Sequence, residues 1–220
     1  MDLQDVIHST NTCRYYRPDP VPDGVLEQVI SAARFAPNGG NRQPVRFVAV
    51  RDPAVKTTLR DLYLPYWNAY MKAAAAGKVR VGILPKAARD ADHFANHLHE
   101  IPVLLMVCAR LEDVHPTDHE LGRLSVVGGA SIYPAVQNLL LSCREAGLGS
   151  ALTTLLCHEE PKIKELLAIP DDISVVATIA VGYPEKSFPR KLSRRPVSEI
   201  AFVDHYGNAL APSNHGGTQA

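Results

Sequence analysis

Three polar stretches contain the side chains of this sequence that could recognise a ligand. The first is residues 10–14, which offers two hydroxyls, one amide and one guanidinium, from Thr10, Thr12, Asn11 and Arg14. All these groups donate hydrogen bonds and the guanidinium adds a fixed positive charge, so the combination suits an anion that carries a polar chain. A plain helix cap would use the same residue types, and the segment alone does not distinguish the two interpretations.

The second stretch is PNGGNRQP, residues 37–44. Its two consecutive glycines would let the backbone approach a flat ligand closely, because glycine carries no Cβ. The amides of Asn41 and Gln43 would then be able to read the N–H and C=O edges of a ring. An ordinary loop is the simpler interpretation, since glycine, proline and asparagine are turn formers.

The third stretch is basic and contains Arg190, Lys191, Arg194 and Arg195. It stands out because the 23 basic and 23 acidic residues of the chain balance to a formal net charge of +0. A solvated run of charges is the simpler interpretation here. The overall balance gives no support to nucleic-acid binding, which requires a basic excess to neutralise phosphates, and we expect no nucleic-acid partner.

Several catalytic patterns are missing from the sequence. It has no G-x-G-x-x-G after a strand, no G-x-x-x-x-G-K-[ST] and no G-x-S-x-G. His93 and His97 would share a helix face, but Phe94 stands where an H-E-x-x-H zinc site carries glutamate, so a polar surface is favoured and we expect no metal site. Glu159 and Glu160 fit the first turn of a helix better than a catalytic carboxylate pair.

The hydrophobic pattern predicts the elements that must position these stretches. Continuous apolar runs predict buried strands at Val45–Val50, Ile101–Ala109 and Ile173–Gly182. Apolar residues at helical spacing predict helices at residues 2–8, Gly24–Phe35 (with Asp23 as N-cap), Pro53 to about Met71, Asp92–His99 and Glu159–Leu167. Ala151–Cys157 reads as loop or strand. The order of elements indicates an α/β or α+β fold whose sheet is flanked by helices.

One further helix, expected within Gly128–Gly149, looks central to the fold. Its apolar residues fall on one stripe and continue onto both flanks, so it belongs inside a packed body or a subunit interface. Its polar residues exclude a membrane span, which needs about 20 predominantly apolar residues in a row. Gly147 and Gly149 are expected to end it, because glycine tolerates the left-handed conformation of a helix C-cap.

The cysteines and the N-terminus bear on the cellular compartment. Four widely spaced cysteines read as buried thiols in a reducing environment, and neither a disulfide framework nor a zinc site fits their spacing. The opening MDLQDVIHST lacks a basic region followed by an apolar one, so we expect no signal peptide. We therefore expect a cytoplasmic protein that does not associate with membranes.

Taken together and in this order, the stretches resemble a known family. Residues 7–16, IHSTNTCRYY, resemble the opening motif of the FMN-dependent nitroreductase family, which is roughly Ile, a short gap and Arg-Arg-Ser-x-Arg-x-Phe. Residues 32–52, with APNGGNRQPVRFVAVRD, resemble its second motif. The helix that ends in Glu145–Gly149, the strand that ends in Val181–Pro184 and the basic tail are similar to the rest of the family pattern.

The resemblance implies a fold and an assembly. The fold would be an α+β flavin sandwich, with a mostly antiparallel central sheet flanked by helices. One domain would cover residues 1–207, with a helical excursion at about 64–99 and a flexible tail at 208–220. Two chains would entwine as a homodimer and form two FMN sites at their interface.

The resemblance also implies which residues contact FMN. Contacts to the phosphate, the ribityl chain or the pyrimidine edge would come from Asn11, Thr12 and Arg14. Thr10 replaces the first arginine of the family, so Arg194, with Arg195 or Lys191, would supply most of the positive charge for the phosphate. The ring held mainly by the other subunit would be reached by Pro37, Asn38, Gly39 and Asn41. Its other face would be covered by Leu152, Thr153 and Thr154, with the Thr154 backbone N–H directed at flavin N5.

The implied activity is transfer of hydride from NAD(P)H through flavin N5 to a small electron-poor acceptor such as a nitroaromatic or a quinone. The flavin carries the chemistry and no side-chain acid or base is required. Arg14 is the first candidate to stabilise the anionic reduced ring. Two alternatives stay open: a dehalogenating or FMN-fragmenting enzyme of the same fold, and a non-catalytic FMN storage protein, which the missing arginine keeps under consideration.

Overall fold

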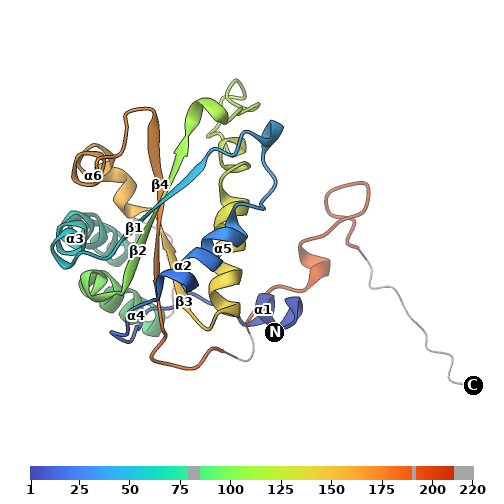
Figure 1. Cartoon of the computed structure of the whole chain (residues 1–220). Helices are drawn as coiled ribbons and strands as arrows, with labels where there is room; N and C mark the ends of the chain where they lie inside the picture. Colours follow the sequence, from blue (N-terminus) through green and yellow to red (C-terminus); the bar gives the residue numbers. More distant parts are fainter. Residues whose placement is uncertain (79–84, 190–191, 211–220) are drawn as a thin grey trace, which may run out of the picture.

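The computed structural model describes residues 1–78, 85–189 and 192–210, and it places one sheet between two layers of helices (Figure 1). The strands are β1 (Val45–Val50), β2 (Val103–Arg110), β3 (Gly149–Thr153) and β4 (Ile173–Gly182), in the spatial order β1-β2-β4-β3. Each neighbouring pair is antiparallel. The expected α+β class with an antiparallel central sheet is confirmed, and so are the three strands expected from apolar runs. The segment read as loop or strand is a strand up to Thr153.

The central strands β2 and β4 are apolar on both faces, and this places them in the middle of the sheet. Successive residues of a strand face opposite sides. Leu104 and Met106 of β2 therefore pack into one hydrophobic core, and Leu105 and Val107 pack into the other. The pair β2–β4 is thus the frame on which both helical layers are built.

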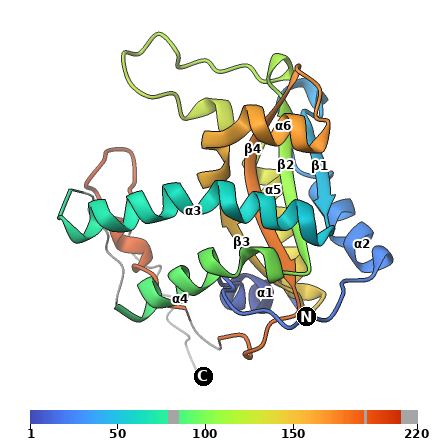
Figure 2. The same cartoon turned by 90° about the vertical axis from the view of Figure 1, so that its left-hand side faces the viewer.

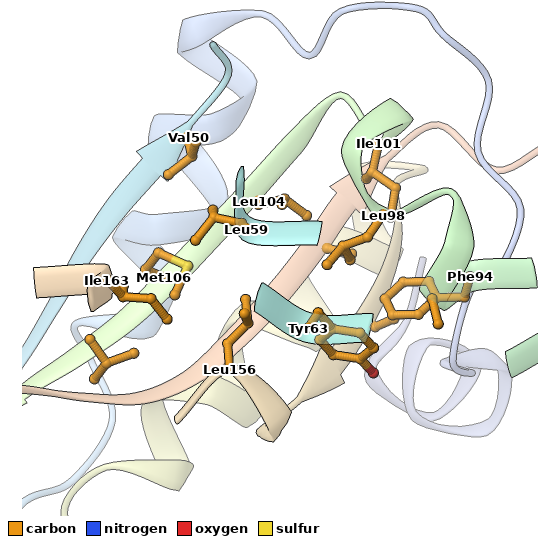
Figure 3. Close-up of a cluster of buried hydrophobic side chains, with 14 of the residues drawn as sticks. Val50, Leu59, Tyr63, Phe94, Leu98, Ile101, Leu104, Met106, Leu156 and Ile163 are labelled. Atoms are coloured by element: carbon orange, nitrogen blue, oxygen red, sulfur yellow. The ribbon is translucent and has the colours of Figure 1, made fainter. Parts of the chain in front are cut away.

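The first helical layer consists of α3 (Pro53–Ala75), α4 (Pro85–Asn96), α6 (Glu160–Leu167) and the 3₁₀ turns η2 (Leu98–Glu100) and η5 (Leu155–Glu159), all on one face of the sheet (Figures 1 and 2). The Asp52 carboxylate caps α3 by accepting from the N–H groups of Ala54 at 2.8 Å and Val55 at 3.0 Å. Figure 3 shows the core between this layer and the sheet, where Leu59 of α3, Met106 of β2 and Ile163 of α6 lie together.

The helical segment expected at about 64–99 is built into this layer. It comprises the second half of α3, α4 and η2, and its Trp67, Phe94 and Leu98 side chains are buried in the core. The Trp67 indole donates to Asp92 at 2.9 Å, which joins α3 to α4. The helix α3 continues past the expected end at Met71, because the alanines that follow are strong helix formers. Residues 79–84, which belong to the expected excursion, lie outside the described residues.

The second layer consists of α2 (Asp23–Ala33) and α5 (Tyr133–Glu145), with α1 (Leu3–Ser9) beside the end of α5 (Figure 1). The α5 helix is shorter than the expected Gly128–Gly149. A 3₁₀ turn, η4 (Val127–Gly129), precedes it, and Gly147 ends it with a φ of 76°, as expected. Gly149 does not help to end the helix, because it is the first residue of β3.

The expected N-cap at Asp23 is wrong. Asp23 is the first residue of α2, Pro22 occupies the cap position, and that cap has no side-chain hydrogen bond. The Asp23 carboxylate pairs instead with Arg51, which directly follows β1. The ion pair ties the start of α2 to the outer strand of the sheet, a contact that the helix pattern alone could not reveal.

The remaining described segments are irregular. They contain the 3₁₀ turns η1 (Gly39–Asn41), η3 (Leu111–Asp113) and η6 (Val197–Glu199). Residues 192–210 extend away from the two layers (Figure 1), and a bridge between Phe202 and Ala209 closes a local turn within them. Residues 211–220 of the expected tail lie outside the described part. Within the ranges described above, no helix combines the length and the hydropathy that a membrane span requires.

Candidate functional site

The first polar stretch is bound to the edge of the sheet. Thr12 forms a parallel bridge with Ser150 of β3, and the Cys13 N–H donates to the Ser150 carbonyl at 2.9 Å. Gly149 permits this approach, because a Cβ at that position would lie 2.6 Å from the Cys13 Sγ. Since β3 is an outer strand, the stretch occupies an edge that the sheet leaves open. The structure thus brings residues 12–14 beside β3.

Thr10 is used by the helix that precedes it. Its hydroxyl donates to the Val6 carbonyl at 2.7 Å, and its N–H donates to the same carbonyl at 3.0 Å. A hydroxyl has a single hydrogen, so Thr10 has no side-chain donor left for an anion in this arrangement. For this residue the helix-cap interpretation is correct. Among the described residues, the Asn11 side chain makes one hydrogen bond, a long one of 3.3 Å to the Thr12 carbonyl, which leaves its amide largely available.

Arg14 lies between two neighbouring cavities. Its guanidinium carbon is 4.8 Å from the centre of the Phe94 ring, which supports the planar group from α4. It lines a small cavity of about 80 Å³ together with Tyr16, and it also lines a larger one of about 220 Å³ together with Asn11. A ligand in the larger cavity would therefore meet a fixed positive charge on one side and polar groups of the first stretch on another.

The end of β3 is fixed by a tyrosine from the first helical layer. The hydroxyls of Tyr63 and Thr153 are 3.1 Å apart, and the Tyr63 side chain is almost fully buried (Figure 3). Burial raises the pKa of Tyr63, while the bond to Thr153 and the charge of Arg14 lower it. Leu152, on the opposite face of the strand, is 37 % exposed. The strand thus exposes the apolar Leu152 side chain, while Tyr63 holds the neighbouring Thr153 on the core side.

The second polar stretch forms a tight, strained loop. Gly40, Asn41 and Gln43 have φ angles of 62°, 52° and 51°, a region that residues with a Cβ rarely adopt. The Asn38 side-chain oxygen accepts from the Gln43 N–H at 2.8 Å, and the Gly39 N–H donates to the Ser131 Oγ at 3.0 Å. These bonds hold an exposed set of amide groups in a conformation that costs free energy, which is typical of a binding loop.

The structure does not bring this second stretch to the first one within a single chain. The second stretch lines a cavity of about 500 Å³ between α2, β1 and the start of α5, which includes Asn38 and Gln43 but not Asn41. Among the described residues, this cavity shares no lining residue with the two cavities beside Arg14. The two candidate halves of the site therefore belong to different surfaces of the chain.

The basic stretch near the C-terminus is only partly described. Arg194 donates to the carbonyl of its neighbour Ser193 at 2.7 Å, and Arg195 is exposed. Arg190 and Lys191 lie outside the described residues. Within the described part of the chain, no hydrogen bond or ion pair joins Arg194 or Arg195 to the first stretch, so their role at a phosphate stays a prediction.

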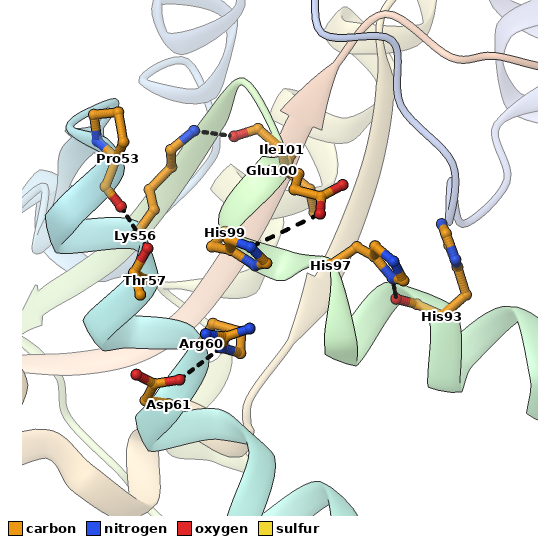
Figure 4. Close-up of polar contacts among 10 residues, drawn as sticks. All are labelled: Pro53, Lys56, Thr57, Arg60, Asp61, His93, His97, His99, Glu100 and Ile101. Carbon is orange, nitrogen blue, oxygen red and sulfur yellow. Dashed lines mark hydrogen bonds and ion pairs between the residues drawn. The ribbon is translucent and has the colours of Figure 1, made fainter.

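The histidine cluster forms a stack of rings on α4 (Figure 4). The His93 and His97 ring centres are 4.1 Å apart, and the His97 Nδ1 lies 2.8 Å from the His93 carbonyl oxygen. Burial lowers the pKa of His93, and the charge of His97 lowers it further. Tyr15 extends the stack at 4.3 Å from His93. Within the described ranges no group of three metal-ligating side chains meets.

Sequence reasoning missed several residues that shape the site, namely Tyr15, Tyr63, Lys86, Asp90, Ser131 and Lys186. Each acts through a tertiary contact with a segment far away in the chain, for example the bond of 2.8 Å from the Tyr15 hydroxyl to Asp90. Tyr15 lies within the opening motif, at a position that the family pattern leaves open, and the other five residues stand in no recognisable motif.

Comparison with known proteins agrees with this geometry. The family model described as the nitroreductase family matches residues 7–183. A protein named NADH dehydrogenase from Thermus thermophilus is 29 % identical over 86 % of this chain and 90 % of its own length. A 5,6-dimethylbenzimidazole synthase from Rhodobacter capsulatus is 31 % identical over 83 % of this chain and 84 % of its own.

A solved structure extends the comparison to the fold. The crystal structure of an iodotyrosine deiodinase bound to FMN and 3-iodo-L-tyrosine superimposes with a TM-score of 0.68 at 23 % identity, covering 94 % of this chain and 100 % of that one. At this identity the likeness concerns the fold. The family match includes the first and second polar stretches and all four strands. This chain therefore belongs to the nitroreductase family.

Proposed function

We propose that this chain is an FMN-dependent oxidoreductase that transfers hydride from NAD(P)H to a small electron-poor acceptor such as a nitroaromatic or a quinone. The observation that carries the proposal is the docking of the first stretch on β3, inside the matched region of the nitroreductase family. This docking places hydrogen-bond donors and a fixed charge along one cavity, next to the strand that exposes Leu152. Relatives named for NADH- and NAD(P)H-dependent activities support the nature of the electron donor.

The side chains of this region suit FMN in their chemistry. A phosphate needs donors and positive charge, which Asn11, Thr12 and Arg14 offer along the cavity of about 220 Å³. A flat ring packs best on an apolar surface, and the exposed Leu152 side chain of β3 offers one. When bound, FMN would take up and release the hydride at its N5 atom.

The chain's own groups would orient the ring and adjust its charge. Arg14, held over Phe94, would place a positive charge near the ring edge that becomes anionic on reduction. The bond between Tyr63 and Thr153 would keep the end of β3 in place, so that the Thr154 backbone N–H is directed at N5. Arg194 and Arg195 would add charge at the phosphate. No side chain of this set needs to gain or lose a proton.

The second stretch supports a homodimer with shared sites. Its strained loop exposes amides beside a cavity that Arg14 does not line, so Pro37, Asn38, Gly39 and Asn41 would complete the site of a second copy. Residues 192–210 also expose apolar side chains away from the body, among them Val197, Ile200, Val203 and Tyr206. Apolar side chains on an extended arm gain most when a partner covers them. The four cysteines are unpaired, which fits a cytoplasmic location.

One specific observation favours a second candidate function. The relative from Rhodobacter capsulatus, 31 % identical, is named for the synthesis of 5,6-dimethylbenzimidazole. An FMN-fragmenting or dehalogenating activity on the same fold is therefore the alternative. The turnover of a nitroaromatic, a halogenated tyrosine and free reduced FMN with oxygen, measured side by side, separates these reactions.

The spectrum of the purified protein tests the proposed function. The protein should be yellow, with the two visible absorption bands of an oxidised flavin, and NADH or NADPH should bleach it without oxygen. A colourless protein that does not take up added FMN would contradict the proposal. A yellow protein that neither NADH nor NADPH bleaches would instead support storage of FMN. This alternative is retained because the Thr10 hydroxyl already donates its hydrogen to Val6.

A further inference from the structure

The cavity of about 220 Å³ lies where three segments meet. These are the first polar stretch, the first residues of α4, and the segment that follows β4. The hydroxyl-bearing Thr12 and the amide-bearing Asn11 line it from the first segment, and Lys86 and Lys186 line it from the other two. The family-like motif therefore supplies only one side of this cavity.

The cavity is positively charged, although the chain as a whole is neutral. Among the described residues, its lining contains Arg14, Lys86 and Lys186 against one carboxylate, Asp90, so three positive charges and one negative charge give a local sum of +2. The Asp90 carboxylate already accepts from the Tyr15 hydroxyl at 2.8 Å. A phosphate monoester carries nearly two negative charges at neutral pH, which matches this local excess.

Lys186 is held at the cavity by an aromatic support. Its Nζ lies 3.6 Å from the centre of the Tyr15 ring, a cation–π contact. Tyr15 is itself fixed twice, by its hydroxyl on Asp90 and by its ring on His93 at 4.3 Å. An exposed lysine normally samples many rotamers, but this support restricts the ammonium group to the cavity rim.

The motif position that carries an arginine in the family pattern cannot provide that charge here. Thr10 donates its only hydroxyl hydrogen to the Val6 carbonyl, and Asn11 is neutral. We propose that Lys186, assisted by Lys86, supplies the positive charge for the phosphate of FMN in place of the missing arginine. The ligand class is a phosphate monoester dianion, and the assignment rests on the proposed FMN site.

Two ligands that differ only by the phosphate test the assignment. The dissociation constants of the flavin-free protein for FMN and for riboflavin are measured by quenching of flavin fluorescence. For Lys186→Gln we expect the FMN constant to rise about ten-fold, with the riboflavin constant unchanged, because a charge-assisted bond to phosphate is lost. Lys86→Gln should have a smaller effect of the same kind, and the double variant should exceed both.

Two further variants make the comparison sharper. Lys162→Gln is the matched control, since Lys162 is an exposed lysine on α6 that pairs with Glu159 and lies outside this cavity. It should change neither constant. Tyr15→Leu removes the support but keeps the charge, so it should weaken FMN alone, and less than Lys186→Gln does. Thermal unfolding of each flavin-free variant shows whether the fold is kept.

The possible results have distinct meanings. An unchanged FMN constant in Lys186→Gln and in the double variant would overturn the assignment while leaving the proposed function intact. Equal weakening of FMN and riboflavin would overturn it too, because the lysines would then act on the ring or on the fold. Unmodified protein that binds neither flavin would contradict the proposed function, and the assignment with it.

Discussion

The first and second polar stretches of this chain are anchored in opposite ways. The first stretch is joined to its own sheet, through the bridge from Thr12 to Ser150 and the 2.9 Å bond from Cys13. The second is an exposed loop, held by its internal bond between Asn38 and Gln43 and by Ser131. The first stretch is thus part of the sheet edge, whereas the second stretch projects from the body of the chain.

This difference indicates what each stretch is for. The first places Arg14 at two cavities, the larger of which it lines together with residues of α4 and of the segment that follows β4. The second keeps Asn41 and Gln43 at positive φ, a conformation that costs free energy. A strained loop whose amides face outward is explained if a site on a second copy of the chain uses these amides. The predictions below test this contrast, from the largest expected effect to the smallest.

The largest effect should follow from separating the first stretch from β3. In Gly149→Val the new side chain would clash with Cys13, because even a Cβ at position 149 would lie 2.6 Å from the Cys13 Sγ. We expect the free energy of unfolding to fall by about 3 kcal/mol and FMN to be lost, because overpacking displaces the backbone. Urea unfolding measures the change. Gly24→Ala, where a Cβ meets nothing within 4 Å, is the control and should cause no loss.

The next effect should come from the charge that the first stretch positions. Arg14→Ala should weaken FMN binding by roughly 30-fold with little change in stability, since a hydrogen bond to a charged group contributes about 2 kcal/mol. Fluorescence titration measures it. Arg17→Ala, which removes an exposed guanidinium paired with Asp19, should behave like the unmodified protein. Equal losses in both variants would mean that the position of Arg14 is not special.

A smaller effect should follow from relaxing the second stretch. Asn38→Ala removes the acceptor for the Gln43 N–H, so the loop should leave its strained conformation. We expect FMN affinity to fall about five-fold, which corresponds to about 1 kcal/mol, while stability changes little. If Asn38→Ala binds FMN as the unmodified chain does, the loop does not contribute to the site.

The smallest effect should be a sensitivity to acid in the loop before α5, whose Ser131 holds the second stretch. Hydrogen bonds from Ser125 at 2.6 Å and from the Val126 N–H at 2.9 Å hold the pKa of Asp118 well below its usual range. A depressed pKa contributes stability above the unfolded value of about 3.9, and this contribution is lost as the pH falls below it. Asp118→Asn should therefore flatten the loss of stability below pH ~4, measured by urea unfolding at several pH values.

Much of the fold could be predicted from the sequence, because the strands are continuous apolar runs. The bounds of Val45–Val50 and Ile173–Gly182 match the expectation. The layer formed by α3 and α4 was less predictable, because these helices are rich in alanine and charged residues. Their place in the core depends on single residues such as Trp67 and Phe94, whose burial is a tertiary property.

Residues of the candidate site could be predicted where they stand in a family motif, but not elsewhere. Arg14 was expected from its motif, and the structure places it at the rim of two cavities. Thr10 was considered both as a cap and as a ligand, and its bond to Val6 favours the cap. Lys186 was missed, because its contact with Tyr15 joins segments about 170 residues apart that only the folded sheet brings together.

The central claim is that each flavin site is built from two copies of the chain, and mixed dimers test it most directly. One chain carries Arg14→Ala and the other carries Asn38→Ala with Asn41→Ala, with different tags so that the heterodimer can be isolated. If the stretches serve opposite subunits, one site of the heterodimer is unmodified and the other carries all the changes. The heterodimer should then retain about half the FMN of the unmodified protein, while both variant homodimers retain much less. A heterodimer as depleted as the homodimers, or a chain that stays monomeric with FMN bound, would contradict the account.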